Sequence, residues 1–176
     1  MQHASLDRID RRILAELQKD GRLTNHELAE KVGLSPSPCL RRTKRLEEAG
    51  VISRYAAIVN AGAIGLEIVA FVRVSLERQQ AANLDAFEQA VTAWPEVQEC
   101  YLMTGESDYQ LRVVATDLAR YEFFLRERLS RTPGVAKIQS SLAFRPVVSR
   151  TELPVPPNED VRRWRNSGVG RADEPA

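Results

Sequence analysis

The sequence predicts an α+β protein in which a helical N-terminal domain precedes a βαββαβ α/β sandwich. Through residues 6–50, apolar residues recur at the spacing of amphipathic helices, and from residue 66 the pattern changes to two similar strand–helix–strand units. A length of 176 residues, with 43% apolar and 28% charged residues, allows two small domains of this kind.

The first helix is predicted ahead of residue 20. Asp7 and Asp10 stand in its first turn, where the helix dipole favours carboxylates. Apolar residues recur behind them at helical spacing, so that one face of the helix can join a core. These apolar residues are Leu6, Ile9, Ile13, Leu14 and Leu17.

Two further helices joined by a tight turn follow. Thr24 and Glu27 form a capping box that starts the second helix, and Gly33 ends it. Ser35 is the predicted N-cap of a third helix over 36–49, because the proline that comes next suits a first helical position. Together the second and third helices are typical of a helix-turn-helix.

The two faces of the third helix differ. Cys39, Thr43 and Leu46 share a stripe that is predicted to face the core, with Leu40 beside it. The opposite side carries a small polar residue and a row of cations, in the part of the helix that enters the major groove in helix-turn-helix proteins. These candidate DNA-binding residues are Ser37, Arg41, Arg42, Lys44 and Arg45.

The charge distribution is also that of a nucleic-acid-binding protein. The formal net charge is only +1, but residues 1–60 hold eleven Lys and Arg against eight Asp and Glu, whereas residues 61–155 hold ten against twelve. Cationic side chains neutralise phosphates, and arginine can also bond guanine bidentately. The alternative is a solvated basic face. The agreement of caps, turn and one-sided basicity favours binding to double-stranded DNA.

Residues 53–65 are predicted to form a linker strand. The run from Val51 to Asn60 is β-prone, and two glycines follow it. This places a winged-helix-like DNA-binding domain at residues 1–52 and the second domain at residues 66–153.

The second domain repeats one pattern twice. A strand over 68–76 is followed by an amphipathic helix and by a strand over 97–104. A strand over 108–115, a second amphipathic helix and a strand ending at Phe144 come in the same order. Each helix ends in a Pro-x-Val exit, so the repeat indicates the ferredoxin-like βαββαβ arrangement.

Two helices can cover only one face of such a sheet. In the first strand, alternate residues from Ile68 to Leu76 lie on one side, while Val69 and Phe71 lie on the other. An apolar patch left exposed on a small domain is typical of an interface. We therefore expect a homodimer formed sheet against sheet, rather than a monomer.

The turn between the middle strands, which begins at Thr104, is a candidate binding site. Gly105 permits a tight backbone turn, and Asp108 offers a carboxylate to an ammonium group while turn N–H groups hold a carboxylate. This is how an amino acid would be bound. The alternative is an ordinary hairpin turn, which the spacing by itself favours. Tyr101 and Met103 likewise fit sheet or interface side chains.

Other chemistry is not indicated. With two cysteines and two histidines and no ligand spacing among them, no catalytic constellation, metal site or cofactor is predicted. The cysteine usage suits a reducing cytoplasm, where a DNA-binding protein is associated with the nucleoid, and no membrane span or signal sequence fits. Residues 154–176 have the composition of a disordered tail. In that tail Trp164 stands among Arg162, Arg163 and Arg165, which could touch DNA or a partner.

Five motifs carry a resemblance to a known family. They are Leu6-Asp7-x-Ile9-Asp10-x-x-Ile13-Leu14, Asp20-Gly21-Arg22, Leu28-Ala29 with Val32-Gly33-Leu34-Ser35-Pro36-Ser37-Pro38-Cys39, Arg42-x-x-Arg45-Leu46-Glu47-x-x-Gly50-Val51-Ile52, and Gly105-x-x-Asp108-Tyr109. Over about residues 5–155 the sequence resembles the Lrp/AsnC family, the feast/famine transcriptional regulators. The tail departs from the family pattern, and nothing is carried over onto it.

The resemblance implies an N-terminal helix-turn-helix, a βαββαβ ligand domain, and dimers that often assemble into octamers. It also implies an amino-acid effector bound between dimers near the Gly-x-x-Asp turn, which makes the effector site the favoured interpretation of that turn. The candidate effector-binding residues are Tyr101, Met103, Thr104, Gly105 and Asp108.

Three functions remain open at this point. The first is a sequence-specific transcriptional regulator that responds to a small effector, an amino acid. The second is a ligand-independent architectural DNA-binding protein, which differs from the first only in whether the turn binds anything. The third is an enzyme or regulatory subunit of amino-acid metabolism that uses the second domain as a sensor. The basic helix and the lack of a catalytic group disfavour the third.

Overall fold

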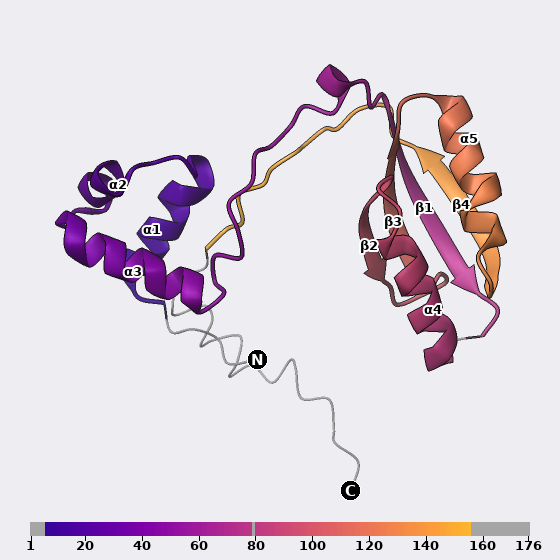
Figure 1. The fold of residues 1–176 in the computed structure, drawn as a ribbon, viewed down its shortest axis with the longest axis horizontal. Coiled ribbons are helices and arrows are strands. Elements are labelled where there is room, and N and C mark those ends of the chain that lie inside the picture. Colours follow the sequence, from indigo (N-terminus) through magenta and orange to yellow (C-terminus); the bar gives the residue numbers. More distant parts are fainter. Residues whose placement is uncertain (1–5, 79, 156–176) are drawn as a thin grey trace, which may run out of the picture. The chain divides into compact units, whose positions relative to one another are not determined.

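The structure is a computed structural model that describes residues 6–78 and 80–155. Their helices and strands form two units (Figure 1). The helical unit contains residues 6–57 together with the segment 148–155, and the sheet unit is Ile58–Val147. The predicted division into residues 1–52, 53–65 and 66–153 stays a prediction. The predicted tail, with Trp164 and its arginines, lies outside the described residues except for Pro154 and Val155.

Three helices make the helical unit: α1 (Arg8–Lys19), α2 (Asn25–Val32) and α3 (Pro36–Glu48). The capping box of Thr24 and Glu27 starts α2 as predicted, and Gly33 ends it at φ 73°, where a residue without Cβ is favoured. The helices share a core of fully or nearly fully buried side chains. That core consists of Ile13, Leu28, Ala29, Val32, Cys39 and Leu46.

A buried carboxylate joins α1 to α3. Asp7 and Asp10 form a capping box at the start of α1, in which each side chain accepts a backbone N–H of the other. Asp10 is fully buried, and its two oxygens also accept hydrogen bonds from Arg42 at 2.9 Å and from Arg45 at 2.6 Å. Arg42 reaches Asp7 as well, at 2.6 Å. The two acids therefore fix the start of α1 against the middle of α3.

The linker differs from the sequence prediction. Residues 53–65 form no strand; the described chain there is irregular, with one 3₁₀ turn at Gly62–Ile64. A strand needs a neighbour that satisfies its backbone groups, and no strand among the described residues pairs with this segment. β-prone composition alone therefore does not make a strand here.

The sheet unit has the predicted ferredoxin-like topology. Its elements are β1 (Ile68–Leu76), α4 (Ala81–Thr92), β2 (Val97–Leu102), β3 (Tyr109–Ala115), α5 (Leu118–Glu127) and β4 (Val135–Leu142). The strands are antiparallel in the order β2-β3-β1-β4, as two βαβ halves require (Figure 1). The α+β fold class is thus confirmed, with strand ends within two residues of their predicted positions.

The two faces of the sheet are as different as the β1 pattern predicts. Val72, Val74 and their neighbours on β3 are fully buried beneath α4 and α5, where they meet Phe87 and Phe124. On the other face Phe71 is 44% exposed. It pairs across the sheet with Arg112, whose guanidinium binds Glu99 at 2.8 Å. The open face is therefore part apolar and part charged, and the homodimer stays a prediction.

We expect Asp10→Ala to lower the free energy of unfolding of the helical unit by about 2 to 3 kcal/mol, because it removes charged hydrogen bonds from a buried acceptor. Urea denaturation followed by far-UV circular dichroism measures this. Glu30→Ala is the matched control, since Glu30 is an exposed acid whose carboxylate lies 3.5 Å from the exposed imidazole of His26, a contact that is an ion pair only if that ring is protonated. Equal effects of the two substitutions would contradict the role given to Asp10.

Candidate functional site

The outer surface of α3 gathers the predicted DNA-binding residues. A shallow hollow there is lined by all five of them, together with two residues that the sequence argument did not include, Leu40 and Glu48. The full lining is Ser37, Leu40, Arg41, Arg42, Lys44, Arg45 and Glu48. Leu40 was predicted beside the core stripe, but it is 44% exposed, because Cys39 and Leu46 fill the core on the other side of the helix.

The four cations of this surface fall into two kinds. Arg42 and Arg45 are bound to the carboxylates of Asp7 and Asp10, whereas Arg41 and Lys44 are exposed and have no ion pair within the described chain. Helical spacing alone places Arg41, Lys44 and Arg45 on the outward side of the helix and Arg42 on its flank, and it gives none of them a partner. Asp7 and Asp10, in the first turn of α1, are the acids that bind Arg42 and Arg45. From the sequence they were interpreted only as acids that interact with the helix dipole.

Electrostatics agree with this division. The backbone N–H of Asp10, followed by the Arg42 guanidinium, lowers the pKa of the Asp7 carboxyl below its ordinary value. The same contacts, with Asp7 first and Asp10 second, raise the pKa of Arg42. The contacts with Asp7 and Asp10 hold the Arg42 guanidinium in one geometry, whereas the side chains of Arg41 and Lys44 are exposed.

The predicted effector residues lie around the turn between β2 and β3. Gly105 has φ 117°, in the region that favours glycine, and nothing lies within 4 Å of where its Cβ would be. Glycine is therefore required by conformation and not by space. Thr104 and Met103 are exposed beside it, and the backbone N–H of Met103 donates to the carbonyl of Asp108 at 2.8 Å.

Asp108 is placed differently from what the sequence argument assumed. Its side chain is buried, and Oδ2 accepts the backbone N–H of Leu76 at 2.7 Å. Its own N–H donates to the carbonyl of Val74 at 2.9 Å, so Asp108 anchors the turn to the end of β1. Tyr101 is 56% exposed and donates to Glu99 at 3.2 Å, on the face of the sheet away from the helices. The structure thus brings Met103, Thr104 and Gly105 together at the surface.

Other kinds of site are not seen in the part of the chain that the structure covers. Within residues 6–78 and 80–155, no group of three or more His, Cys, Asp or Glu side chains is arranged to hold a metal ion. No helix in these ranges combines the length and apolarity that crossing a bilayer requires.

Comparison with known proteins assigns a family to each half of the chain. Residues 6–53 match a winged helix-turn-helix DNA-binding family, and residues 69–153 match the Lrp/AsnC ligand binding domain. A leucine-responsive regulatory protein of Rhizobium meliloti is 47% identical over 150 residues, which are 85% of this chain and 96% of that protein. The Bkd operon transcriptional regulator of Pseudomonas aeruginosa is 46% identical over 86% of this chain and 99% of its own length.

A solved structure is similar over the same range. A transcriptional regulator of Neisseria meningitidis in complex with L-methionine has a TM-score of 0.82 and 43% identity, and the match covers 85% of this chain and 97% of that one. The similarity extends over both the helix-turn-helix and the ligand-binding match.

We expect Gly105→Ala to cost about 1 to 3 kcal/mol of stability, because alanine is strained at this φ. Gly62→Ala is the matched control: it also adds one methyl group at a surface glycine with ordinary contacts, but its φ lies outside the positive region. Thermal unfolding of both variants compares them. A Gly105→Ala protein as stable as the control would show that the turn relaxes to a conformation open to any residue.

Proposed function

This chain belongs to the Lrp/AsnC family of transcriptional regulators, and on that premise we propose that it binds double-stranded DNA sequence-specifically and responds to an amino acid. The observation that carries the DNA-binding part is the outer surface of α3. Its cations line one hollow, and the helix that bears them is fixed against α1 by Asp10.

DNA recognition follows from the two kinds of cation. A helix in the major groove presents its N-terminal half to base edges. Arg41 and Lys44 are then the side chains that reach bases and phosphates, with Ser37 beside them as a short hydrogen-bonding group. Arg42 and Arg45 act as positioning residues whose remaining N–H groups can also meet the phosphate backbone, since a guanidinium has five.

The effector part rests on the ligand-binding family match and on the turn at Gly105. The solved regulator from Neisseria meningitidis holds L-methionine, and several relatives are named leucine-responsive. We propose that Tyr101, Met103, Thr104, Gly105 and Asp108 form the effector site of this chain. Met103 and Thr104 would supply contact surface, while Asp108 sets the shape of the turn and contributes its negative charge to an ammonium group.

Assembly and location are part of the same proposal. The half-open face of the sheet around Phe71 supports a homodimer, which would present two α3 helices to half-sites about 34 Å apart. Such dimers would assemble further into an octamer, as the family resemblance implies. The protein would act on DNA in the cytoplasm, at the nucleoid.

One observation favours the architectural alternative. The Asp108 carboxylate already accepts the Leu76 N–H, so its burial is explained without a ligand. A thermal-shift screen of the twenty amino acids separates the two functions, since a ligand at 100 times its dissociation constant adds about 2.7 kcal/mol. An enzymatic role has no support from the matched families or the named relatives, which are regulators.

We expect Arg41→Ala and Lys44→Ala each to weaken DNA binding without changing thermal stability. A lost base contact costs about 1 to 3 kcal/mol of binding free energy. A lost phosphate contact makes the slope of log affinity against log salt concentration shallower by about one. Arg42→Ala should lower both DNA affinity and stability, because Arg42 also binds Asp7 and Asp10.

Fluorescence anisotropy with a DNA fragment selected by the protein from a random library measures the affinities. Arg22→Ala is the matched control, an exposed cation of the helical unit outside the α3 hollow. Wild-type affinity for both the Arg41 and the Lys44 variants would remove α3 from the interface.

We expect Asp108→Asn to retain DNA binding and fold stability but to lose the thermal shift given by the effector amino acid. Asparagine keeps an oxygen acceptor for the Leu76 N–H and removes the charge. Asp85→Asn, an exposed acid on α4, is the control. Calorimetry that finds equal amino-acid affinity in wild type and Asp108→Asn would leave Asp108 as a purely structural residue.

A further inference from the structure

Leu40 is an apolar residue on the polar outer surface of α3. It is 44% exposed and lines the same hollow as the cations of that surface. It is the fifth residue of α3, about one turn after Ser37 and one turn before Lys44, and therefore lies in the N-terminal half of the helix. A rotation of about 100° per residue places Ser37, Leu40 and Lys44 on one side of α3.

Packing within the helical unit does not account for this leucine. The buried core receives Cys39 and Leu46 from α3, and partly buried side chains such as Leu34 and Val51 pack against it. Within the part of the chain that the structure describes, Leu40 does not belong to this core cluster. A single exposed leucine on an ordinary surface needs no explanation. Leu40 differs because it stands among the side chains that we propose to face base edges.

The major groove offers one apolar group to such a side chain. The edges of adenine, guanine and cytosine present hydrogen-bond donors and acceptors, whereas thymine presents a C5 methyl group beside its O4 acceptor. A leucine side chain makes no hydrogen bond, so against a polar edge it displaces water without replacing the lost bonds. Against a methyl group it removes apolar surface of both partners from water. A leucine in the groove therefore favours thymine and disfavours the other bases.

We propose that Leu40 recognises the C5 methyl group of a thymine in the DNA site. The inference rests on the proposed binding of α3 in the major groove, and it adds the base that the apolar residue of this helix selects. Contacts of Arg41 and Lys44 with phosphates and bases hold the helix in register, so that Leu40 meets a defined base pair. Because leucine carries no charge, it contributes sequence preference without contributing to the salt dependence of binding.

Deoxyuridine tests the methyl group alone, because it pairs with adenine as thymine does and lacks only the C5 methyl. In the DNA fragment that the full-length protein selects from a random library, each thymine is replaced in turn by deoxyuridine. Fluorescence anisotropy then measures the affinity of the wild-type protein for each fragment. At the thymine that Leu40 contacts, we expect the affinity to fall about fourfold, which is the effect of losing one buried methyl group.

Substitutions of Leu40 assign the methyl contact to this side chain. Leu40→Ala should bind the thymine fragment and the deoxyuridine fragment with equal affinity, because the contact is already lost. Leu40→Met keeps an apolar side chain of similar size and should retain the difference between the two fragments. Neither variant should change the slope of log affinity against log salt concentration. Alanine and methionine both favour helix, so α3 should stay intact, which circular dichroism checks.

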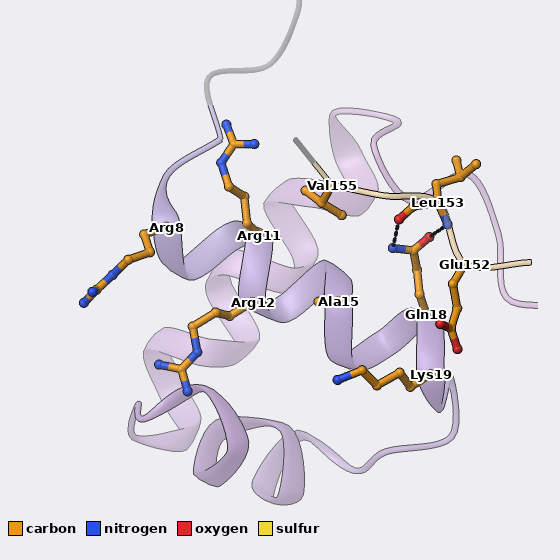
Figure 2. A pocket seen from close by; sticks show the side chains of 9 residues that line it. All are labelled: Arg8, Arg11, Arg12, Ala15, Gln18, Lys19, Glu152, Leu153 and Val155. Carbon is orange, nitrogen blue, oxygen red and sulfur yellow. Dashed lines mark hydrogen bonds between the residues drawn. The ribbon is translucent and has the colours of Figure 1, made fainter. Parts of the chain in front are cut away.

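Leu153 provides the matched control, because it is an exposed leucine of the helical unit outside the α3 hollow. It belongs to the C-terminal segment that returns to α1, where it is held through its backbone (Figure 2). The Gln18 side chain donates Nε2–H to the Leu153 carbonyl at 3.1 Å, and its Oε1 accepts the Leu153 backbone N–H at 2.7 Å. Leu153→Ala keeps both backbone groups, so we expect unchanged DNA affinity and unchanged sensitivity to deoxyuridine.

Two results would overturn the proposal while leaving DNA binding by α3 intact. One is a wild-type protein that binds its selected sequence equally well after every replacement of thymine by deoxyuridine. The other is a loss of affinity at a deoxyuridine that persists in full in Leu40→Ala, which would assign that methyl group to another side chain. Failure of the wild-type protein to select any sequence would instead contradict the proposed function, and the Leu40 contact with it.

Discussion

The arrangement of the helical unit depends on one buried carboxylate. Asp10 has no exposed surface, yet it caps the first turn of its own helix and binds two arginines of α3. A buried charge is tolerated only when its oxygens are fully hydrogen-bonded, and here backbone and guanidinium groups occupy both of them. If Asp10 were removed, the guanidinium groups of Arg42 and Arg45 would each lose a carboxylate acceptor. The α3 surface that we propose to bind DNA and the stability of the helical unit therefore depend on the same contact.

The sheet unit uses an aspartate in a related way. Asp108 is also buried, but its partners are the backbone groups of Leu76 and Val74 at the end of β1, so it fixes a turn and not a helix. Gly105 supplies the one conformation in that turn that other residues reach only with strain. In the helical unit, Asp10 fixes the helix that carries the α3 cations. In the sheet unit, Asp108 fixes the turn after β2.

Local signals predicted most of the fold, and long-range contacts account for what was missed. The Thr24 capping box, the Gly33 stop and the alternation in β1 each depend on residues a few positions apart, and the structure confirms all three. The predicted strand over 53–65 failed because strand formation needs a partner that periodicity cannot supply. The pairing of Arg42 and Arg45 with Asp10 spans 32 and 35 positions, and the Leu76–Asp108 bond spans 32. Sequence pattern alone could place these residues on a face but could not pair them.

The contact between Gln18 and Leu153 joins residues 135 positions apart. N-terminal segments fold first during synthesis, which adds about 5 to 20 residues per second. At that rate, Leu153 is added roughly 7 to 27 seconds after Gln18. Throughout that interval the side of α1 that carries Gln18 is open on the nascent chain. The contact can form only after Leu153 has been synthesised, so a chain truncated before Leu153 would never form it.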